Sequence, residues 1–298
     1  MEKAIKLEIK RLCRKKQQKN NTIQAKKNQY REKFKKRTGI QGKLPQDKNP
    51  YLNNHFDPAH CARHSNIIAR TIWKKVCTNT YRPIPAIKHQ IPKPNGGVRE
   101  IMAFSIPDSA LANVIFRNIR DRNVKKLSPF SYAYDPRKNL FDAILALKSG
   151  INYKRLFSVQ IDFQNYFDSI PTKYMNRLLD DRELVATTPH ERFVLKEFMR
   201  HQFADRLNYQ NQKFSRRHRG TPQGSSISLF LANLANHELD MALERKSGKF
   251  VRYADDVVAL CSSYAESEQI EETFIGHCKN SGLIINEKKS PGIALIKK

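Results

Sequence analysis

Two neighbouring carboxylates, Asp255 and Asp256, stand between short apolar runs in Phe-Val-Arg-Tyr-Ala-Asp-Asp-Val-Val-Ala-Leu at residues 250–260. The valines and leucine favour strands, so this segment predicts a β-hairpin with the acids at or near its tight end. Adjacent carboxylates repel each other and lose hydration among apolar neighbours, a cost that a divalent cation would offset. A solvated acidic turn is the competing interpretation of this stretch alone, because aspartate is favoured in turns.

A third carboxylate, Asp162, ends an alternating run in which Phe157, Val159 and Ile161 predict a β-strand. Aromatic residues follow it, so the carboxylate is poorly solvated unless it has a partner, and a metal ion shared with Asp255 and Asp256 is the obvious candidate. The alternative is a helix N-cap. Asp168 is the better candidate for a cap or turn residue, because the chain breaks at Ser-Ile-Pro directly after it.

Two other segments have the residue types that bind anions. Extended runs over 84–92 and 98–104, joined by Lys-Pro-Asn-Gly-Gly, predict a hairpin from which Lys93 and Arg99 could hold a phosphate, although an ordinary basic hairpin reads the same way. In Gly-Thr-Pro-Gln-Gly-Ser-Ser, Gly220 and Gly224 permit close backbone approach and Gln223 can hydrogen-bond a polar ligand. Just before it, a basic cluster suggests polyanion contact: Lys213, Arg216, Arg217 and Arg219.

Helices and strands alternate around these segments, which indicates an α+β fold. Apolar residues at three- and four-residue steps predict helices over 51–81, from Pro107, from Asn139, over 174–206, after Gly224 and over 264–280. In the first of these, Ile67, Ile68 and Ile72 are expected on the face toward the core. A short strand is expected at 283–285, and 291–298 has room for one more.

The charge is strongly one-sided. The chain has 298 residues, of which 39% are apolar, and a formal net charge of +27. This charge predicts a polyanionic partner, and the lack of a long apolar segment or signal sequence favours nucleic acid over a membrane and a cytoplasmic setting. The cysteines are odd in number and have no paired spacing, which predicts reduced thiols: Cys13, Cys61, Cys77, Cys261 and Cys278.

Nearly half of the net charge lies in residues 1–49, which contain 17 Lys and Arg against four acidic residues. We expect a basic arm of one or two exposed helices followed by a turn-rich connection, with Lys15 and Lys16 among its nucleic-acid contacts. The alternative is a solvated helix that only keeps the protein soluble.

Taken in order, these motifs resemble those of reverse transcriptases, in particular the bacterial branch of group II intron, retron and defence-associated enzymes, over about residues 83–291. Tyr-Ala-Asp-Asp at 253–256 is similar to the family's catalytic hairpin, Asp162-Phe163 to its first catalytic motif, and 220–226 to its template and nucleotide loop. The resemblance implies right-hand polymerase fingers and palm, with an antiparallel palm sheet backed by helices. The expected parts are a basic N-terminal arm at 1–49, fingers at 50–155 with 171–218 partly fingers or palm helices, and a palm with the catalytic hairpin at 156–298.

The resemblance also implies site roles. Asp162, Asp255 and the backbone carbonyl of Phe163 would bind two Mg²⁺ ions, with Asp256 in support. Phe167 occupies a steric-gate position that favours dNTPs over ribonucleotides. The other implied nucleotide contacts are Lys93, Arg99, Gln223, Gly224 and Lys289, the last resembling the lysine proposed to protonate pyrophosphate, although Lys288 lies beside it.

The family pattern continues into a helical thumb, for which this chain is expected to be too short. A structured RNA, a protein partner, an oligomer or the basic arm would then replace it. The expected function is RNA-directed DNA synthesis in a bacterial cytoplasm. The expected partners are an RNA template or a structured non-coding RNA, and the DNA product or hybrid duplex. A role in antiphage defence is a further expectation. Untemplated or protein-primed synthesis and a noncatalytic RNA-binding or splicing role are the alternatives.

Overall fold

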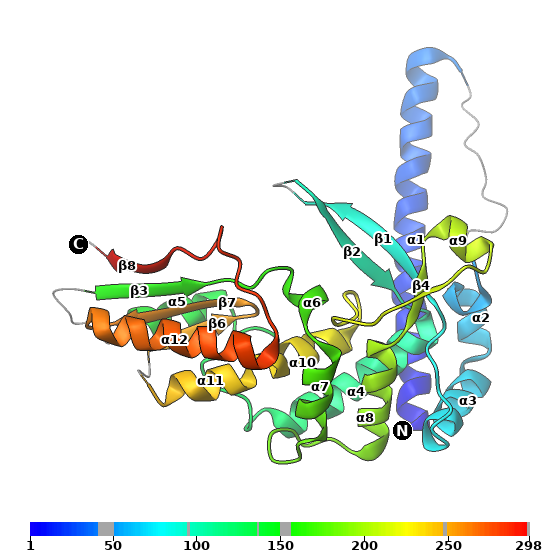
Figure 1. Cartoon of the computed structure of the whole chain (residues 1–298). Coiled ribbons are helices and arrows are strands. Elements are labelled where there is room, and N and C mark those ends of the chain that lie inside the picture. Colours follow the sequence, from blue (N-terminus) through cyan, green and yellow to red (C-terminus); the bar gives the residue numbers. More distant parts are fainter. Residues whose placement is uncertain (41–50, 94–95, 136, 150–155, 247–248, 297–298) are drawn as a thin grey trace.

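Helices and two four-stranded β-sheets make up the fold, which is α+β as the sequence predicts (Figure 1). The computed structural model describes residues 1–40, 51–93, 96–135, 137–149, 156–246 and 249–296. One sheet contains the acidic hairpin, here defined as residues 250–261, and the other lies nearer the N-terminal helix (Figure 1).

The sheet with the acidic hairpin is antiparallel throughout, in the order β6-β7-β3-β8. Its alternating residues Val159, Ile161 and Val257 are buried in one cluster with Ile270 and Phe274 of the covering helix. This alternation is what a sheet with one packed face requires. Its strands are β3 (Leu156–Ile161), β6 (Phe250–Tyr253), β7 (Asp256–Cys261) and β8 (Gly292–Ile296), and the helices behind it are α12 (Tyr264–Ser281) and α11 (His237–Glu244).

The second sheet has the order β2-β1-β4-β5. Its long hairpin, with Ile91 paired to Arg99, is the one predicted from the sequence, whereas the parallel pairing of β1 with β4 was not predicted. That pairing draws part of the expected 171–218 region into this sheet. The strands are β1 (Ala86–Pro92), β2 (Val98–Ala103), β4 (Gln202–Ala204) and β5 (Ser215–Arg216).

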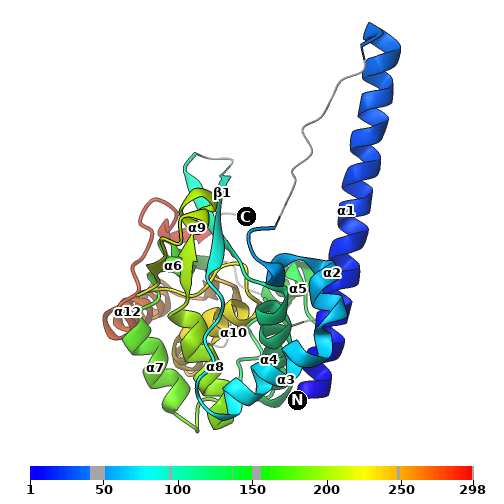
Figure 2. The ribbon, with the colours of Figure 1, turned by 90° about the vertical axis from the view of Figure 1, so that its right-hand side faces the viewer.

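Some of the remaining helices pack between and beneath the two sheets, and others lie beside the N-terminal helix (Figures 1 and 2). In α4 the predicted stripe is buried, including Leu111, Ile115 and Ile119. These elements are η1 (Asn54–Phe56), α2 (Pro58–Arg63), α3 (Ser65–Cys77), α4 (Ile106–Asn123), α5 (Leu140–Lys148), α6 (Tyr166–Ser169), α7 (Thr172–Asp180), α8 (Pro189–Met199), α9 (Arg206–Gln210) and α10 (Ser226–Ala235).

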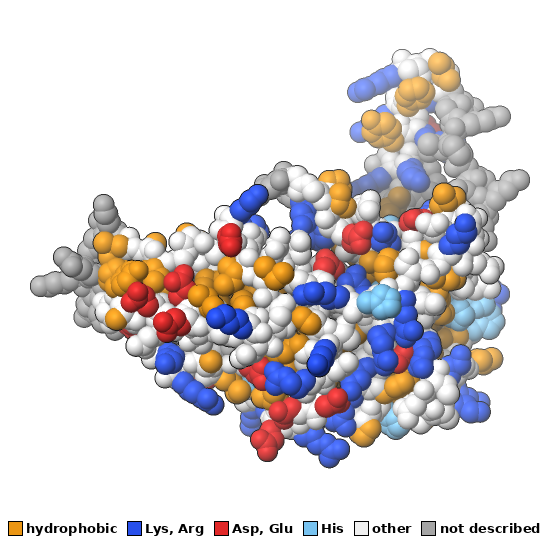
Figure 3. Space-filling view, viewed as in Figure 1, with side chains coloured by type: hydrophobic (Ala, Val, Ile, Leu, Met, Phe, Trp, Pro, Cys, Tyr) orange, Lys and Arg blue, Asp and Glu red, His pale blue; other side chains and the backbone are white. Residues whose placement is uncertain are grey.

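The basic arm is one helix, α1 (Glu2–Thr38), and the expectation that it is exposed is wrong for its first turns. Ile5, Ile9 and Cys13 are buried against α2, α3 and α4, because they recur every four residues on one face. Beyond them, residues 17–38, here called the distal segment, are exposed and project from the molecule (Figures 2 and 3). The expected turn-rich connection at 41–50 lies outside the described residues.

Three local predictions also need correction. Ile67, expected in the core, is 68% exposed, because Ile68 and Ile72 already fill the packed face of α3. The expected strand at 283–285 forms only a single bridge between Phe163 and Ile285. The apolar helix after Gly224 is interrupted at Asn236, which separates α10 from α11.

All five cysteines are free, as predicted. Among the described helices, none combines the length and apolar character needed to cross a membrane.

Candidate active site

The acidic hairpin turns tightly at its two acids. Tyr253 pairs with Asp256 across the ladder, so Ala254 and Asp255 form a two-residue turn. Ala254 has a φ of 62°, a left-handed conformation that costs an L-residue about 1–2 kcal/mol. The surrounding structure must therefore hold this turn, which places Asp255 at the tip and Asp256 at the start of β7.

The third acid, Asp162, lies beside this turn. Ile161 pairs with Val257, so the next residues along the two strands, Asp162 and Asp256, meet at the end of the ladder, and their carboxyl groups are within hydrogen-bonding reach. Burial raises the pKa of both Asp255 and Asp256, and the negative charge of Asp162 raises them further. The three acids, which are distant in the sequence, therefore lie close together at one end of this sheet.

Asp162 is held from a direction that the sequence did not suggest. The side chain of Asn286 donates to Asp162 Oδ2 at 3.0 Å, and its backbone N–H donates to the carbonyl of Asp162 at 2.8 Å. Ser290 Oγ accepts from the Asp162 N–H at 3.0 Å, and Lys289 Nζ lies 3.5 Å from Asp162 Oδ2. Only Lys289 was singled out from the sequence; the polar spacing of Asn286, Lys289 and Ser290 was the available signal.

The donor set suits a hard divalent cation. Carboxylate oxygens are the ligands that Mg²⁺ prefers. Burial, and then the neighbouring acids, raise the pKa of Asp255 and Asp256, so a bound cation would favour their charged forms. As placed, the described residues include no three His, Cys, Asp or Glu side chains that close around one ion. The fit therefore rests on the chemistry and charge of the donors.

A cleft of about 1310 Å³ opens over Asp162 and Asp255, whereas Asp256 does not line it. Its size exceeds that of a typical small-ligand pocket, so a nucleotide and part of a polymer can share it. The predicted site residues that line it are Lys93, Arg99, Asp162, Phe163, Phe167, Arg216, Arg217, Arg219, Gln223, Gly224, Asp255 and Lys289.

The Gly-Thr-Pro-Gln-Gly loop, residues 220–224, joins the two sides of this cleft. A Cβ on Gly220 would lie 2.7 Å from the backbone of Asp168, and one on Gly224 would lie 2.3 Å from the carbonyl of Met102. Both glycines also have positive φ, so their identity is required twice over. The Thr221 N–H donates to the carbonyl of Phe167 at 2.6 Å, which fixes the backbone that carries the aromatic ring.

Asp168 organises one wall of the cleft, although the sequence suggested only a cap or turn for it. Its carboxylate accepts from Arg217 Nη1 at 3.1 Å and from Gln223 Nε2 at 3.2 Å. Arg217 is 8% exposed. Arg219 donates to the backbone carbonyls of Ser169 and Gly282, and Arg216 donates to the carbonyl of Arg200. All three arginines therefore make hydrogen bonds within the protein, although Arg216 and Arg219 are exposed.

Lys15 and Lys16, on α1, do not line the cleft. Lys16 donates to the carbonyl of Phe56 at 3.3 Å, and burial lowers its pKa. Lys15 is exposed. Any contact of theirs with nucleic acid would be outside the acidic site.

Comparison with known proteins is decisive for the family. The profile of the family described as Reverse transcriptase (RNA-dependent DNA polymerase) matches residues 91–294. The chain belongs to the reverse transcriptase family. The match includes strand β2, Asp162, the Gly-Thr-Pro-Gln-Gly loop and the acidic hairpin of this reverse transcriptase, but only the last two residues of β1.

A curated relative is the Putative COX1/OXI3 intron 2 protein of Saccharomyces cerevisiae, which is 25% identical over 174 residues. The match covers 58% of this chain but only 19% of the yeast protein.

Two telomerase structures share the fold. Apo telomerase from Candida tropicalis, truncated from its C-terminal domain, has a TM-score of 0.50 at 13% identity, and the match covers 78% of this chain and 60% of the telomerase chain. Telomerase from Candida albicans, in complex with a fragment of telomeric RNA, has a TM-score of 0.54 at 12% identity, and the match covers 80% of this chain and 46% of the telomerase chain. This reverse transcriptase therefore spans about half the length of these structures.

Proposed function

We propose that this chain is an RNA-directed DNA polymerase that adds deoxynucleotides from dNTPs to the 3′-hydroxyl of a primer. The observation that supports it best is the convergence of Asp162 with Asp255 and Asp256 at a cleft lined by basic residues and Phe167. In this proposal residues 50–155 and part of 171–218 form the fingers, and 156–298 form the palm.

Asp162, Asp255 and the carbonyl of Phe163 would hold two Mg²⁺ ions, with Asp256 in support. When bound, these ions activate the primer hydroxyl and neutralise the triphosphate in an in-line displacement. The carboxylate oxygens of these residues, and the position of Asp255 at the turn where it lines the cleft, support this assignment.

The other residues of the cleft bind and orient the nucleotide. Lys93 and Arg99 are exposed near the end of the β1–β2 hairpin, where they would bind the triphosphate, and Lys289 would give a proton to the departing pyrophosphate. The ring of Phe167 would exclude a ribose 2′-hydroxyl. Gln223 and Gly224 would contact the nucleotide through the loop that packs against β2.

Primer extension on an RNA template with labelled dNTPs tests the proposal. Asp255→Ala and Asp256→Ala should each abolish extension, whereas Asp121→Ala, which removes an exposed acid paired with Arg120, should leave it unchanged. Extension that survives in both hairpin variants would exclude this mechanism. Product sequencing separates copying from untemplated or protein-primed synthesis, since random DNA joined to protein would indicate the latter.

A second candidate function, RNA binding as a splicing cofactor, is favoured by the α1 helix and by the yeast intron protein. The distal segment carries eight Lys and Arg and one acid, and all its residues are exposed. A structured RNA is the partner that this charge would attract. RNA affinity that depends steeply on salt but not on Asp255 would support it.

Sequencing of copurifying RNA would test the further proposals of a bacterial cytoplasmic setting, a dedicated non-coding RNA and antiphage defence.

A further inference from the structure

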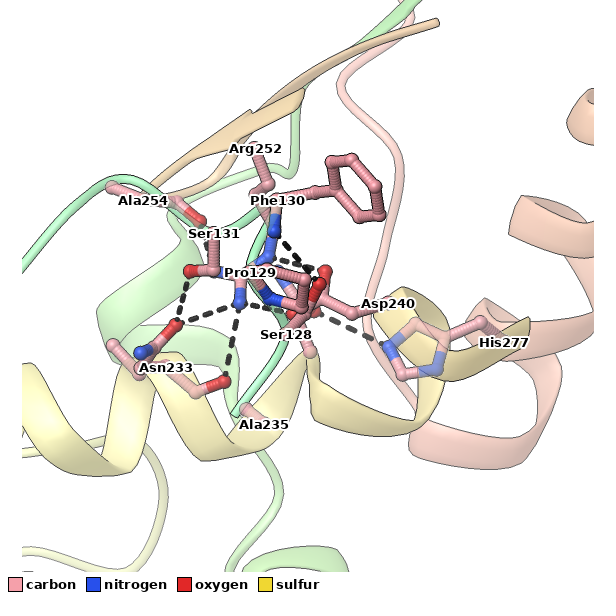
Figure 4. Close-up of polar contacts among 12 residues, drawn as sticks. Ser128, Pro129, Phe130, Ser131, Asn233, Ala235, Asp240, Arg252, Ala254 and His277 are labelled. Carbon is pink, nitrogen blue, oxygen red and sulfur yellow. Dashed lines mark hydrogen bonds and ion pairs between the residues drawn. The ribbon is translucent and has the colours of Figure 1, made fainter. Parts of the chain in front are cut away.

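A buried polar network lies directly behind the turn of the acidic hairpin (Figure 4). At its centre Arg252, the largest fully buried side chain, is 0% exposed. Its Nε and Nη2 donate to the two carboxylate oxygens of Asp240 at 2.7 and 2.5 Å, and Nη2 also donates to Asn233 Oδ1 at 2.7 Å. Its Nη1 donates to the backbone carbonyl of Ala254 at 2.9 Å.

We propose that Arg252 is a positioning residue that fixes the turn of the acidic hairpin, and so the placement of Asp255, against helices α10 and α11. This inference rests on the proposed polymerase function. Ala254 is the residue with the left-handed backbone, and its carbonyl is the group that Arg252 binds. A restraint at this carbonyl acts one bond away from Asp255.

The partners of Arg252 connect this turn to the rest of the site. Asn233 belongs to α10, the helix that begins just after the Gly-Thr-Pro-Gln-Gly loop, and Asp240 belongs to α11. One guanidinium therefore binds the acidic turn and both helices at once. A lysine could not do so, because its single ammonium lacks the planar fork of donors.

The backbone of Arg252 is held independently of its side chain. Its N–H donates to the carbonyl of Phe130 at 2.9 Å, and its carbonyl accepts from the N–H of Tyr132 at 2.8 Å. Ser131 Oγ also donates to Asn233 Oδ1 at 2.8 Å, so Asn233 keeps a donor without Arg252. Removing the guanidinium should thus leave strand β6 in place and release the turn.

Stability alone is a poor reason for this network. Replacing a buried ion pair by well-packed apolar residues is often neutral or stabilising, whereas removing one partner leaves an uncompensated charge. This difference separates a positioning role from a structural one. The double variant Arg252→Met/Asp240→Leu removes both charges together and leaves the carbonyl of Ala254 without its guanidinium donor.

The experiment compares the double variant, Arg252→Lys and wild type in single-nucleotide extension at saturating dNTP and template-primer. Arg122→Met is the control for the general cost of losing a guanidinium, because it leaves a buried carboxylate, that of Glu191, without its partner away from the hairpin. A slight misplacement of a reacting group can cost about 10²-fold in rate, so we expect a loss of roughly that size in both Arg252 variants, with the KM for dNTP changed little. Hydrogen exchange at 253–256 should rise in the double variant and not in Arg122→Met.

Wild-type rates in a folded double variant would overturn the proposal, as would unchanged exchange at 253–256. If the double variant does not fold, Arg252→Lys is the deciding variant. The positioning role is refuted if its extension rate per folded molecule equals that of wild type. It is also refuted if its loss of rate is no larger than that of Arg122→Met at equal thermal stability. If the wild-type chain extends no primer, the proposed function fails, and the hydrogen-exchange comparison still tests the restraint on the turn.

Discussion

Replacing Asn286 by alanine should slow nucleotide addition while leaving the fold intact. The side chain of Asn286 donates to Asp162 Oδ2 at 3.0 Å, and its backbone N–H separately donates to the carbonyl of Asp162. The substitution removes only the first bond, so the segment stays docked. A hydrogen bond to a charged group contributes about 1.5–3 kcal/mol, and about 1.4 kcal/mol is tenfold in rate, so a bond needed in the transition state predicts a loss of roughly 10- to 100-fold.

The assay is single-turnover addition of one dNTP on an RNA template, with rate and apparent dNTP affinity measured separately. Asn208→Ala is the control, because Asn208 makes a comparable bond to Asp205, at 2.7 Å, on an exposed surface away from the acids. A rate for Asn286→Ala within twofold of wild type, with Mg²⁺ dependence unchanged, would show that Asn286 does not orient Asp162. A loss equal to that of Asn208→Ala would point instead to a general effect on the fold.

Four further predictions follow from the site and the arm. Burial and neighbouring acids raise the pKa of Asp256 in the folded state, so its charge destabilises the metal-free protein as pH rises through that pKa. Asp256→Asn should therefore raise the melting temperature at pH 7 without divalent ions and reduce the increase in melting temperature that Mg²⁺ produces. A lower melting temperature of the metal-free variant would contradict this. Gly224→Ala should abolish extension and lower the free energy of unfolding in urea by about 1–3 kcal/mol. The control Gly276→Ala, in helix α12 with open space around the new Cβ, should raise that free energy by about 0.5–1 kcal/mol. Equal effects of the two substitutions would refute the close-packing argument. Phe167→Ala should increase rNTP incorporation relative to dNTP, and an unchanged ratio in competition assays would exclude the steric gate. Neutralising the eight basic residues of 17–38 should lower the slope of log affinity for RNA against log salt by about 0.7–0.9 for each lost phosphate contact, and an unchanged slope would remove the arm from RNA binding.

The sequence predicted the parts of the site that depend on local pattern. The alternation of apolar residues predicted β3 and the acidic hairpin, and the Asn-Gly pair predicted the β1–β2 hairpin. These predictions depend only on neighbouring residues, because strand period and turn preference are local properties of the sequence. The expectation that Asp162 meets Asp255 and Asp256 came from its poorly solvated position at a strand end, and the resemblance to a family supported it. Spacing along the chain alone does not determine which strands become neighbours in a sheet.

What the sequence did not predict depends on contacts between distant segments. Asn286 meets Asp162 across 124 residues, and Asp168 meets Gln223 across 55. Strands β4 and β5 have three and two residues, too few for a periodic signal, and are defined by their pairing partners. Ile5 and Ile9 have a spacing typical of a packed helix face, but the large excess of lysine and arginine around them favoured an exposed arm.

The acids are placed by restraints from several directions, and this explains how like charges can be held together without a fixed counterion of equal charge. Asn286, Lys289 and Ser290 hold Asp162 from one segment, and Arg252 holds the turn that carries Asp255 from the opposite side. Lys289 is the one cation among these groups that contacts an acid of the site directly, and its side chain is 67% exposed. Its attraction is therefore screened by solvent, so the charge of the three acids stays largely uncompensated. A site that binds divalent ions together with a triphosphate, and releases them after each addition, needs rigid carboxylates with residual negative charge. A fully neutralised cluster of acids would gain little free energy from binding these ions.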